Sequence, residues 1–157
     1  MKHFLIITIA FLVASCGASY QANQLEKNFK GNWTLESISY PEASGFFDVE
    51  LFRVANASCF ENSVWNFISN NSSGNFTLDG SGCDKSTNQF TWYIDPNTLE
   101  NTDPELLIKI TTGYKARKVN TGSRIKIKSL SDTEMVWEQN AIFKGKEIKI
   151  ELTFSNL

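Results

Sequence analysis

Apolar and polar residues alternate in short runs over most of the chain, from Gly31 to the C-terminus. In the last third, Ile148, Ile150, Leu152 and Phe154 are each separated by one charged or polar residue. A period of two places alternate side chains on opposite faces of a β-strand, so the pattern predicts an antiparallel sheet with one apolar and one wet face. We predict eight strands, at residues 31–40, 63–69, 75–79, 88–95, 105–112, 123–130, 134–143 and 146–154.

Two turns set the pairing of the last three predicted strands. A turn centred on Asp132 places Ile127 opposite Trp137 on the apolar face. A two-residue hairpin loop at residues 144–145 places Trp137 opposite Leu152, again on the apolar face. The two turns therefore predict the same inward face for the middle strand. A slip of one residue would bring lysines into the core, which also favours this register.

The segment from Phe46 to Ser58 does not follow the alternation. Phe47, Leu51, Val54 and Ala55 have the spacing of one helical face, which favours a short helix between the first two strands. The β-branched and aromatic residues of this segment leave a strand open as the alternative.

The N-terminus has the organisation of an export signal. Lys2 precedes an apolar run of 11 residues, Phe4 to Ala14, which is too short to span a bilayer as a helix. Its last two residues and the three that follow, Val13-Ala14-Ser15-Cys16-Gly17, resemble the bacterial lipobox. This resemblance implies removal of residues 1–15 as a signal peptide and acylation of Cys16, for example with palmitate. The alternative is cleavage elsewhere, with loss of Cys16.

Lipidation would tether the protein to a membrane without a spanning segment. Residues 16–30 are polar and show no period, so we expect a lipidated N-terminus and flexible tether, followed by a folded domain over residues 31–157. The Gly17 that follows the cysteine favours the outer membrane of a bacterial envelope, by resemblance to known sorting rules.

Two cysteines remain after Cys16. Cys59 and Cys83 each lie 12 residues from Asn71, within a turn at residues 70–74, so they would meet at the base of a hairpin. In an oxidising compartment such a pair predicts one disulfide, and two free thiols are the alternative. The spacing is not that of a CxxC redox or zinc motif.

A family resemblance adds to this reading. Gly31-Asn32-Trp33 matches the Gly-x-Trp opening of lipocalins. The run Cys59-x-x-Asn62-x-x-Trp65-x-Phe67, followed by Gly74-x-Phe76, Cys83 and Trp92, resembles the lipocalin-like lipoproteins of Bacteroidota. The resemblance implies an all-β fold of calycin type: an antiparallel up-and-down eight-stranded lipocalin-like β-barrel, here with one short helix, and one disulfide.

A barrel of this size is either filled by its own side chains or holds one small ligand. The alternation gives an apolar, aromatic set of inward residues suited to a small hydrophobic ligand, with Gln139 as a candidate polar contact. These candidate ligand-binding residues are Trp33, Trp65, Phe67, Phe76, Phe90, Trp92, Met135, Trp137 and Gln139. Four tryptophans favour an open cavity, because large rings are hard to pack in a narrow interior.

Composition excludes several functions. A net charge of -2 argues against a nucleic-acid partner. The single histidine, His3, leaves with the signal peptide, so no imidazole remains for nucleophilic catalysis or metal ligation. We therefore expect no enzyme activity, no catalytic residue, no cofactor and no metal. The loop from Asp79 to Asp84 carries oxygen ligands but lacks the last acidic ligand of an EF-hand calcium loop.

Two hypotheses remain. The first is a membrane-tethered carrier of a small hydrophobic ligand in the bacterial envelope. The alternative is a filled barrel that acts as a protein-interaction or envelope-assembly module, whose protein partner the sequence does not name. Lys115, Arg117 and Lys118 form one basic loop that would meet a partner or anionic headgroups, or be an ordinary solvated hairpin.

Overall fold

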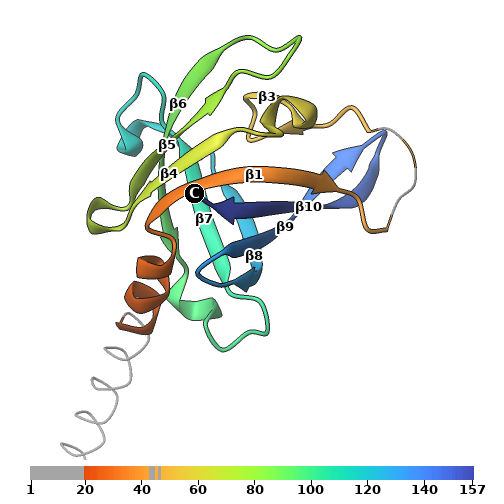
Figure 1. Ribbon diagram of the computed structural model, residues 1–157. Coiled ribbons are helices and arrows are strands. Elements are labelled where there is room, and N and C mark those ends of the chain that lie inside the picture. Colours follow the sequence, from red (N-terminus) through yellow and green to blue (C-terminus); the bar gives the residue numbers. More distant parts are fainter. Residues whose placement is uncertain (1–19, 43–44, 46) are drawn as a thin grey trace, which may run out of the picture.

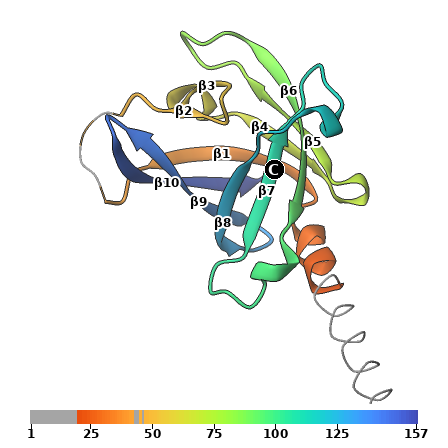
Figure 2. The same ribbon diagram turned by 180° about the vertical axis from the view of Figure 1, so that it is seen from behind.

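A computed structural model describes residues 20–42, 45 and 47–157 (Figures 1 and 2). Eight antiparallel strands form a closed barrel in the order β1-β10-β9-β8-β7-β6-β5-β4, with β4 pairing back onto β1. The predicted all-β, up-and-down barrel is confirmed. The strands are β1 (Gly31–Ser39), β4 (Val64–Ile68), β5 (Ser73–Leu78), β6 (Ser86–Ile94), β7 (Glu105–Ile110), β8 (Ser123–Leu130), β9 (Glu134–Phe143) and β10 (Lys146–Asn156).

The predicted register is confirmed for the last three strands. Trp137 lies opposite both Ile127 of β8 and Leu152 of β10. The β9–β10 pairing runs without a shift from Phe143 to Glu134, whereas the β8–β9 pairing slips by one residue between Ile127 and Ser129. This β-bulge bends β8, and such a bend helps a sheet to curve into a barrel.

One end of the barrel carries a helix that the sequence analysis did not predict. Residues 20–28 are helical, where we expected a flexible tether through residue 30. The helix buries Ala22, and the following Phe29 packs on the rings of Phe67 and Trp92 at centroid distances of 5.7 and 5.3 Å. The helix thus covers this end of the barrel, which we call the closed end (Figure 1). Residues 1–19, including the predicted signal peptide and Cys16, lie outside the described residues.

The prediction of a helix within residues 46–58 is wrong for the described part of that segment. Strands β2 (Glu50–Leu51) and β3 (Ala55–Asn56) form a small hairpin, and the 3-10 helix η1 (Ala57–Phe60) follows. The hairpin turns at Phe52 and Arg53, whose φ angles of 55° and 57° are left-handed and incompatible with an α-helix. Burial of Leu51 and Phe52 against the barrel outweighs the helical spacing of the apolar residues.

The predicted disulfide between Cys59 and Cys83 is confirmed, with an S–S distance of 2.03 Å. It ties η1 to the loop between β5 and β6. Both segments lie at the end of the barrel opposite the helix, together with the β2–β3 hairpin, the β7–β8 connection and the β9–β10 turn. We call this end the mouth. Three further 3-10 helices are η2 (Ser69–Asn71), η3 (Pro96–Thr98) and η4 (Ala116–Lys118).

Candidate functional site

The nine inward residues predicted from the alternation all lie inside the barrel. Gln139 is 8% exposed, and the other eight are at most 1% exposed. Trp65 stands at the centre of this set: its ring stacks on Phe76 at 4.3 Å and meets Trp137 edge-on at 5.7 Å. The rings were expected to leave a cavity, but they contact one another and fill the space between the strands. We call this set of rings around Trp65 the central stack. The structure corrects the expectation of an open cavity there, because rings from several strands interlock in tilted and edge-to-face pairs.

The indole N–H groups of the four tryptophans differ in their partners. Trp33 donates to the Phe29 carbonyl, Trp65 to the Ser63 hydroxyl and Trp92 to the Ser73 carbonyl, each at 2.9 Å. The Trp137 Nε1 is buried and has no hydrogen-bond partner among the described residues. A buried unpaired donor destabilises the fold by about 1–3 kcal/mol, so the Trp137 indole is a polar mismatch in the central stack.

Phe52 closes the mouth above the stack. Its ring lies 5.6 Å from both Phe60 and Trp65, and the residue is 8% exposed. The left-handed turn at the hairpin tip directs the ring inward, and the same turn places Arg53 at the rim. The disulfide at Cys59 holds η1, and therefore Phe60, beside this hairpin.

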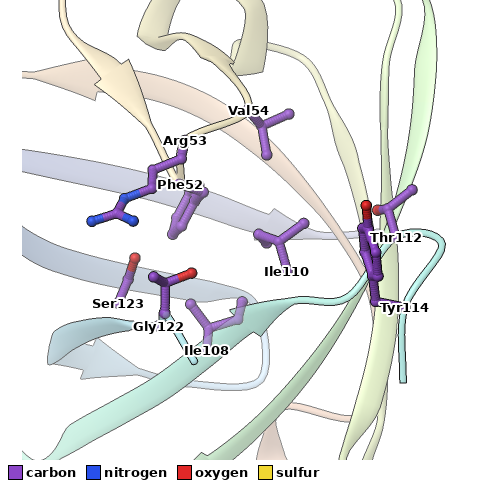
Figure 3. A pocket seen from close by; sticks show the side chains of 10 residues that line it. Phe52, Arg53, Val54, Ile108, Ile110, Thr112, Tyr114, Gly122 and Ser123 are labelled. Atoms are coloured by element: carbon purple, nitrogen blue, oxygen red, sulfur yellow. The ribbon is translucent and has the colours of Figure 1, made fainter. Parts of the chain in front are cut away.

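A cavity of about 240 Å³ lies between the hairpin and strands β7 and β8, and we call it the mouth cavity (Figure 3). Its apolar side is formed by Phe52, Val54, Ile108 and Ile110. Figure 3 shows the Phe52 ring on the side of Ile108, and the Arg53 side chain extending on the side of Ser123. The remaining lining residues are Thr112, Tyr114, Thr121 and Gly122.

A second, more polar hollow of about 610 Å³ adjoins the first across the hairpin tip, because both are lined by Phe52, Arg53 and Ser123. Gln139 lines this second hollow, so it lies at the mouth. Asp48 and Glu50 also line it, which makes its outer wall acidic. Among the described residues, Arg53 takes part in none of the ion pairs.

Several charged groups on the outer face of the barrel form ion pairs. Arg124 binds Glu105 at 2.7 Å and Asp95 at 3.2 Å, and these contacts raise the pKa of its guanidinium. The pKa of the Asp95 carboxyl is lowered, first by the backbone N–H of Asn97 and then by Arg124. Beside the hairpin, burial and the nearby carboxylate of Glu61 raise the pKa of Tyr40. These groups are structural contacts outside the mouth cavity.

Comparison with known families identifies the fold. The family model described as the lipocalin-like domain matches residues 29–137 of the chain. The chain belongs to the lipocalin-like domain family. A comparison with curated proteins finds no match. The matched segment of this lipocalin-like domain runs from Phe29, which covers the closed end, to Trp137 in the central stack.

Sequence reasoning missed the residues that form the mouth cavity of this lipocalin-like domain. Phe52 and Arg53 lay in the segment predicted as a helix, and only the reversal of the chain brings them to the mouth. Ile108 and Ile110 belong to a correctly predicted strand, and their alternation does mark them as inward residues. That signal could have identified the wall of the cavity formed by β7, but not the wall formed by the β2–β3 hairpin.

The basic residues and the candidate calcium loop of the sequence analysis both lie on connections between strands. Lys115, Arg117 and Lys118 lie on the β7–β8 connection, at and beside η4. The loop from Asp79 to Asp84 lies at the mouth and contains Cys83, which the disulfide joins to Cys59 of η1. Within residues 20–42, 45 and 47–157, no cluster of three histidine, cysteine or acidic side chains is arranged to hold a metal ion. None of the helices in this part of the chain has the length and hydropathy needed to cross a bilayer.

Proposed function

We propose that this lipocalin-like barrel is a binding protein that takes one small, mostly apolar ligand at its mouth and performs no catalysis. The observation that carries the proposal is the mouth cavity, which places Phe52, Ile108 and Ile110 around a hollow of about 240 Å³. Apolar cavities with a few polar groups at the rim are the usual form of small-molecule sites.

The size of the cavity limits the ligand. A volume of about 240 Å³ lies just below the usual range of about 300–1,000 Å³ for drug-sized ligands, so a compact ring system or short branched chain fits better than a long acyl chain. The central stack below Phe52 leaves a long chain no straight path into the barrel axis. The ligand would therefore lie across the mouth, between the hairpin and β7.

Arg53 determines the polar end of the ligand. Its guanidinium stands at the boundary of the two hollows and carries no ion pair within the described chain. A carboxylate, sulfonate or phosphate group would accept hydrogen bonds there, since guanidinium groups bind such anions in a bidentate way. We propose an apolar ligand with one anionic group, oriented with that group toward Arg53.

A fluorescent probe of this chemistry tests the proposal. 8-Anilinonaphthalene-1-sulfonate, an aromatic sulfonate, is titrated into the soluble chain that begins after Cys16. Ser123→Leu fills the mouth cavity and should weaken binding at least about tenfold, the equivalent of 1.4 kcal/mol. Ser129→Leu makes the same change at an exposed site further along β8 and should leave binding unchanged. Equal effects of the two variants, or no saturable binding, would refute the proposal.

We also propose that Cys16 is acylated and tethers the protein to the envelope, with the outer membrane as its destination. The lipobox-like residues and Gly17 support this proposal. Metabolic labelling with an alkyne analogue of palmitate should label the protein and not its Cys16→Ser variant. The Gly17→Asp variant should be recovered in the inner-membrane fraction to a greater extent than the unchanged protein, as measured by membrane fractionation. A labelled Cys16→Ser variant would contradict the tether.

A second candidate is an interaction or envelope-assembly module without a small ligand. The filled central stack around Trp65 favours it, because rings that already occupy the centre of the barrel need no ligand to complete the core. Native mass spectrometry with envelope lipid extracts separates the two candidates. A bound small molecule lost in Ser123→Leu supports the mouth site, and an unchanged mass with every extract supports the interaction module.

A further inference from the structure

Positive charge is concentrated in one stretch of this acidic protein. Between Leu106 and Ser131 the chain has seven lysine and arginine residues and no acidic residue. Three of the seven neutralise carboxylates within the fold: Arg124 pairs with Asp95 and Glu105, Lys126 with Glu138 and Lys128 with Asp103. The structure thus assigns these three a structural role and separates them from the other four.

The other four cations have no carboxylate partner within the described part of the chain. They are Lys109, Lys115, Arg117 and Lys118. Lys109 contacts the β7–β8 connection through a hydrogen bond from its Nζ to the Val119 carbonyl, at 3.4 Å. This contact holds the connection, and η4 within it, near the outer wall of β7. The unpaired charges of Lys115, Arg117 and Lys118 therefore lie on a loop that folds back toward β7.

A groove of about 470 Å³ lies beside this loop, and we call it the outer groove. Its walls are the β4–β5 turn at Asn71 on one side and η4 at Arg117 on the other. Leu107 and Tyr93 line it from the outer faces of β7 and β6, and Tyr93 is 46% exposed. Both views show the β4–β5 turn and the β7–β8 connection on the same side of the barrel (Figures 1 and 2).

We infer that the outer groove binds an extended acidic segment of a partner protein, one in which glutamate or aspartate residues accompany aliphatic or aromatic residues. The apolar side chains would contact Tyr93 and Leu107, and the carboxylates would pair with Arg117 and Lys109. An exposed tyrosine beside an arginine is a common centre of protein interfaces. The surplus positive charge would also speed the encounter with an acidic partner.

The shape of the groove favours a peptide chain over a membrane surface. Leu107 is partly buried between the raised β4–β5 turn and η4, so a narrow segment can reach it. A lipid surface is flat on this scale and would contact the protruding turn and η4 before it reached Leu107. This inference does not depend on the mouth site, because the two sites share no lining residue.

Selection from a defined peptide library tests the inference. Phage-displayed random peptides are selected on the folded, disulfide-bonded chain and counter-selected on its Arg117→Glu variant. The recovered sequences should be enriched in acidic residues that flank leucine, isoleucine or phenylalanine. A synthetic peptide of the recovered sequence, labelled with fluorescein, is then measured by anisotropy at low and high salt. Affinity should fall with added salt, since the paired charges are exposed.

Two variants and one control decide the outcome. Arg117→Glu and Tyr93→Ser should each weaken peptide binding about tenfold or more, the equivalent of 1.4 kcal/mol. Lys146→Glu makes a similar charge reversal at an exposed site by the β9–β10 turn and should have no such effect. Ser123→Leu should also leave peptide binding intact, which separates this result from the mouth site. Recovery of peptides without acidic enrichment, equal losses in Lys146→Glu, or stronger binding to phosphatidylglycerol vesicles than to the peptides would overturn the inference.

Discussion

The unpaired indole of Trp137 allows a prediction from two matched substitutions. Trp137→Phe removes a buried N–H that has no partner, whereas Trp33→Phe removes an N–H that donates to the Phe29 carbonyl at 2.9 Å. Both tryptophans are fully buried, and both substitutions delete the same atoms. The cavity left by the smaller ring is therefore similar in the two variants, and the difference between them reports the hydrogen bond.

The magnitude follows from the two N–H environments. Loss of the bond from Trp33 costs about 1 kcal/mol, and removal of the unpaired donor at Trp137 recovers about 1 kcal/mol or more of desolvation. Trp33→Phe should therefore lower the free energy of unfolding by about 2 kcal/mol more than Trp137→Phe. In melting temperature this is a difference of about 4–8 °C for a domain of this size.

The assay is urea denaturation followed by far-ultraviolet circular dichroism, with the disulfide intact. Trp92→Phe, which removes a donor to the Ser73 carbonyl, should resemble Trp33→Phe and serves as the control. Trp137→Phe should also keep full affinity for the probe at the mouth, because Trp137 does not line that cavity. A difference between Trp33→Phe and Trp137→Phe below about 0.5 kcal/mol would refute the reasoning, since it lies within the context dependence of such terms.

Three further predictions concern the contacts that hold the barrel ends. The double variant Cys59→Ser, Cys83→Ser should lose roughly 3 kcal/mol of stability, as expected when a cross-link over 24 residues is removed, and an unchanged urea midpoint would contradict this. Glu26→Ala should cost about 2 kcal/mol because the Ile94 backbone N–H loses its buried carboxylate acceptor, and hydrogen exchange at that amide should speed up. The pKa of Asp95 is lowered in the folded state, so its contribution is present above about pH 4 and is lost as pH falls through the lowered value. Asp95→Asn should flatten the pH dependence of the unfolding free energy in that acid range, and an unchanged slope would count against this contact.

The strands and their inward faces were readable because they depend on local order. Met135, Trp137 and Gln139 all point inward on β9, as the alternation predicts, since successive side chains of a strand must face opposite ways. The hairpin turn between β9 and β10 then propagates one register along the whole pair. The one-residue slip between Ile127 and Ser129 left no such signal, because a bulge changes the pairing without changing the composition.

The N-terminal helix was missed although its spacing was present. Ala22, Leu25 and Phe29 occupy the first, fourth and eighth positions of a helical face. Glu26 interrupts this apolar stripe, and a charged residue there suggests a solvated segment. Its carboxylate is instead buried and accepts the backbone N–H of Ile94, 68 residues away in the chain. A local pattern cannot show a partner at that distance.

The sequence by itself determined the eight strands, their apolar face and the pairing of the two cysteines, since alternation, turns and spacing are properties of neighbouring residues. Only the tertiary structure decided that the rings around Trp65 fill the barrel and that Phe52 and Arg53 move the candidate site to the mouth. The physical reason is that filling depends on the combined volume and orientation of side chains from many strands, which close-packing settles collectively. Alternation tells which side chains point inward, and their packing tells whether any space remains.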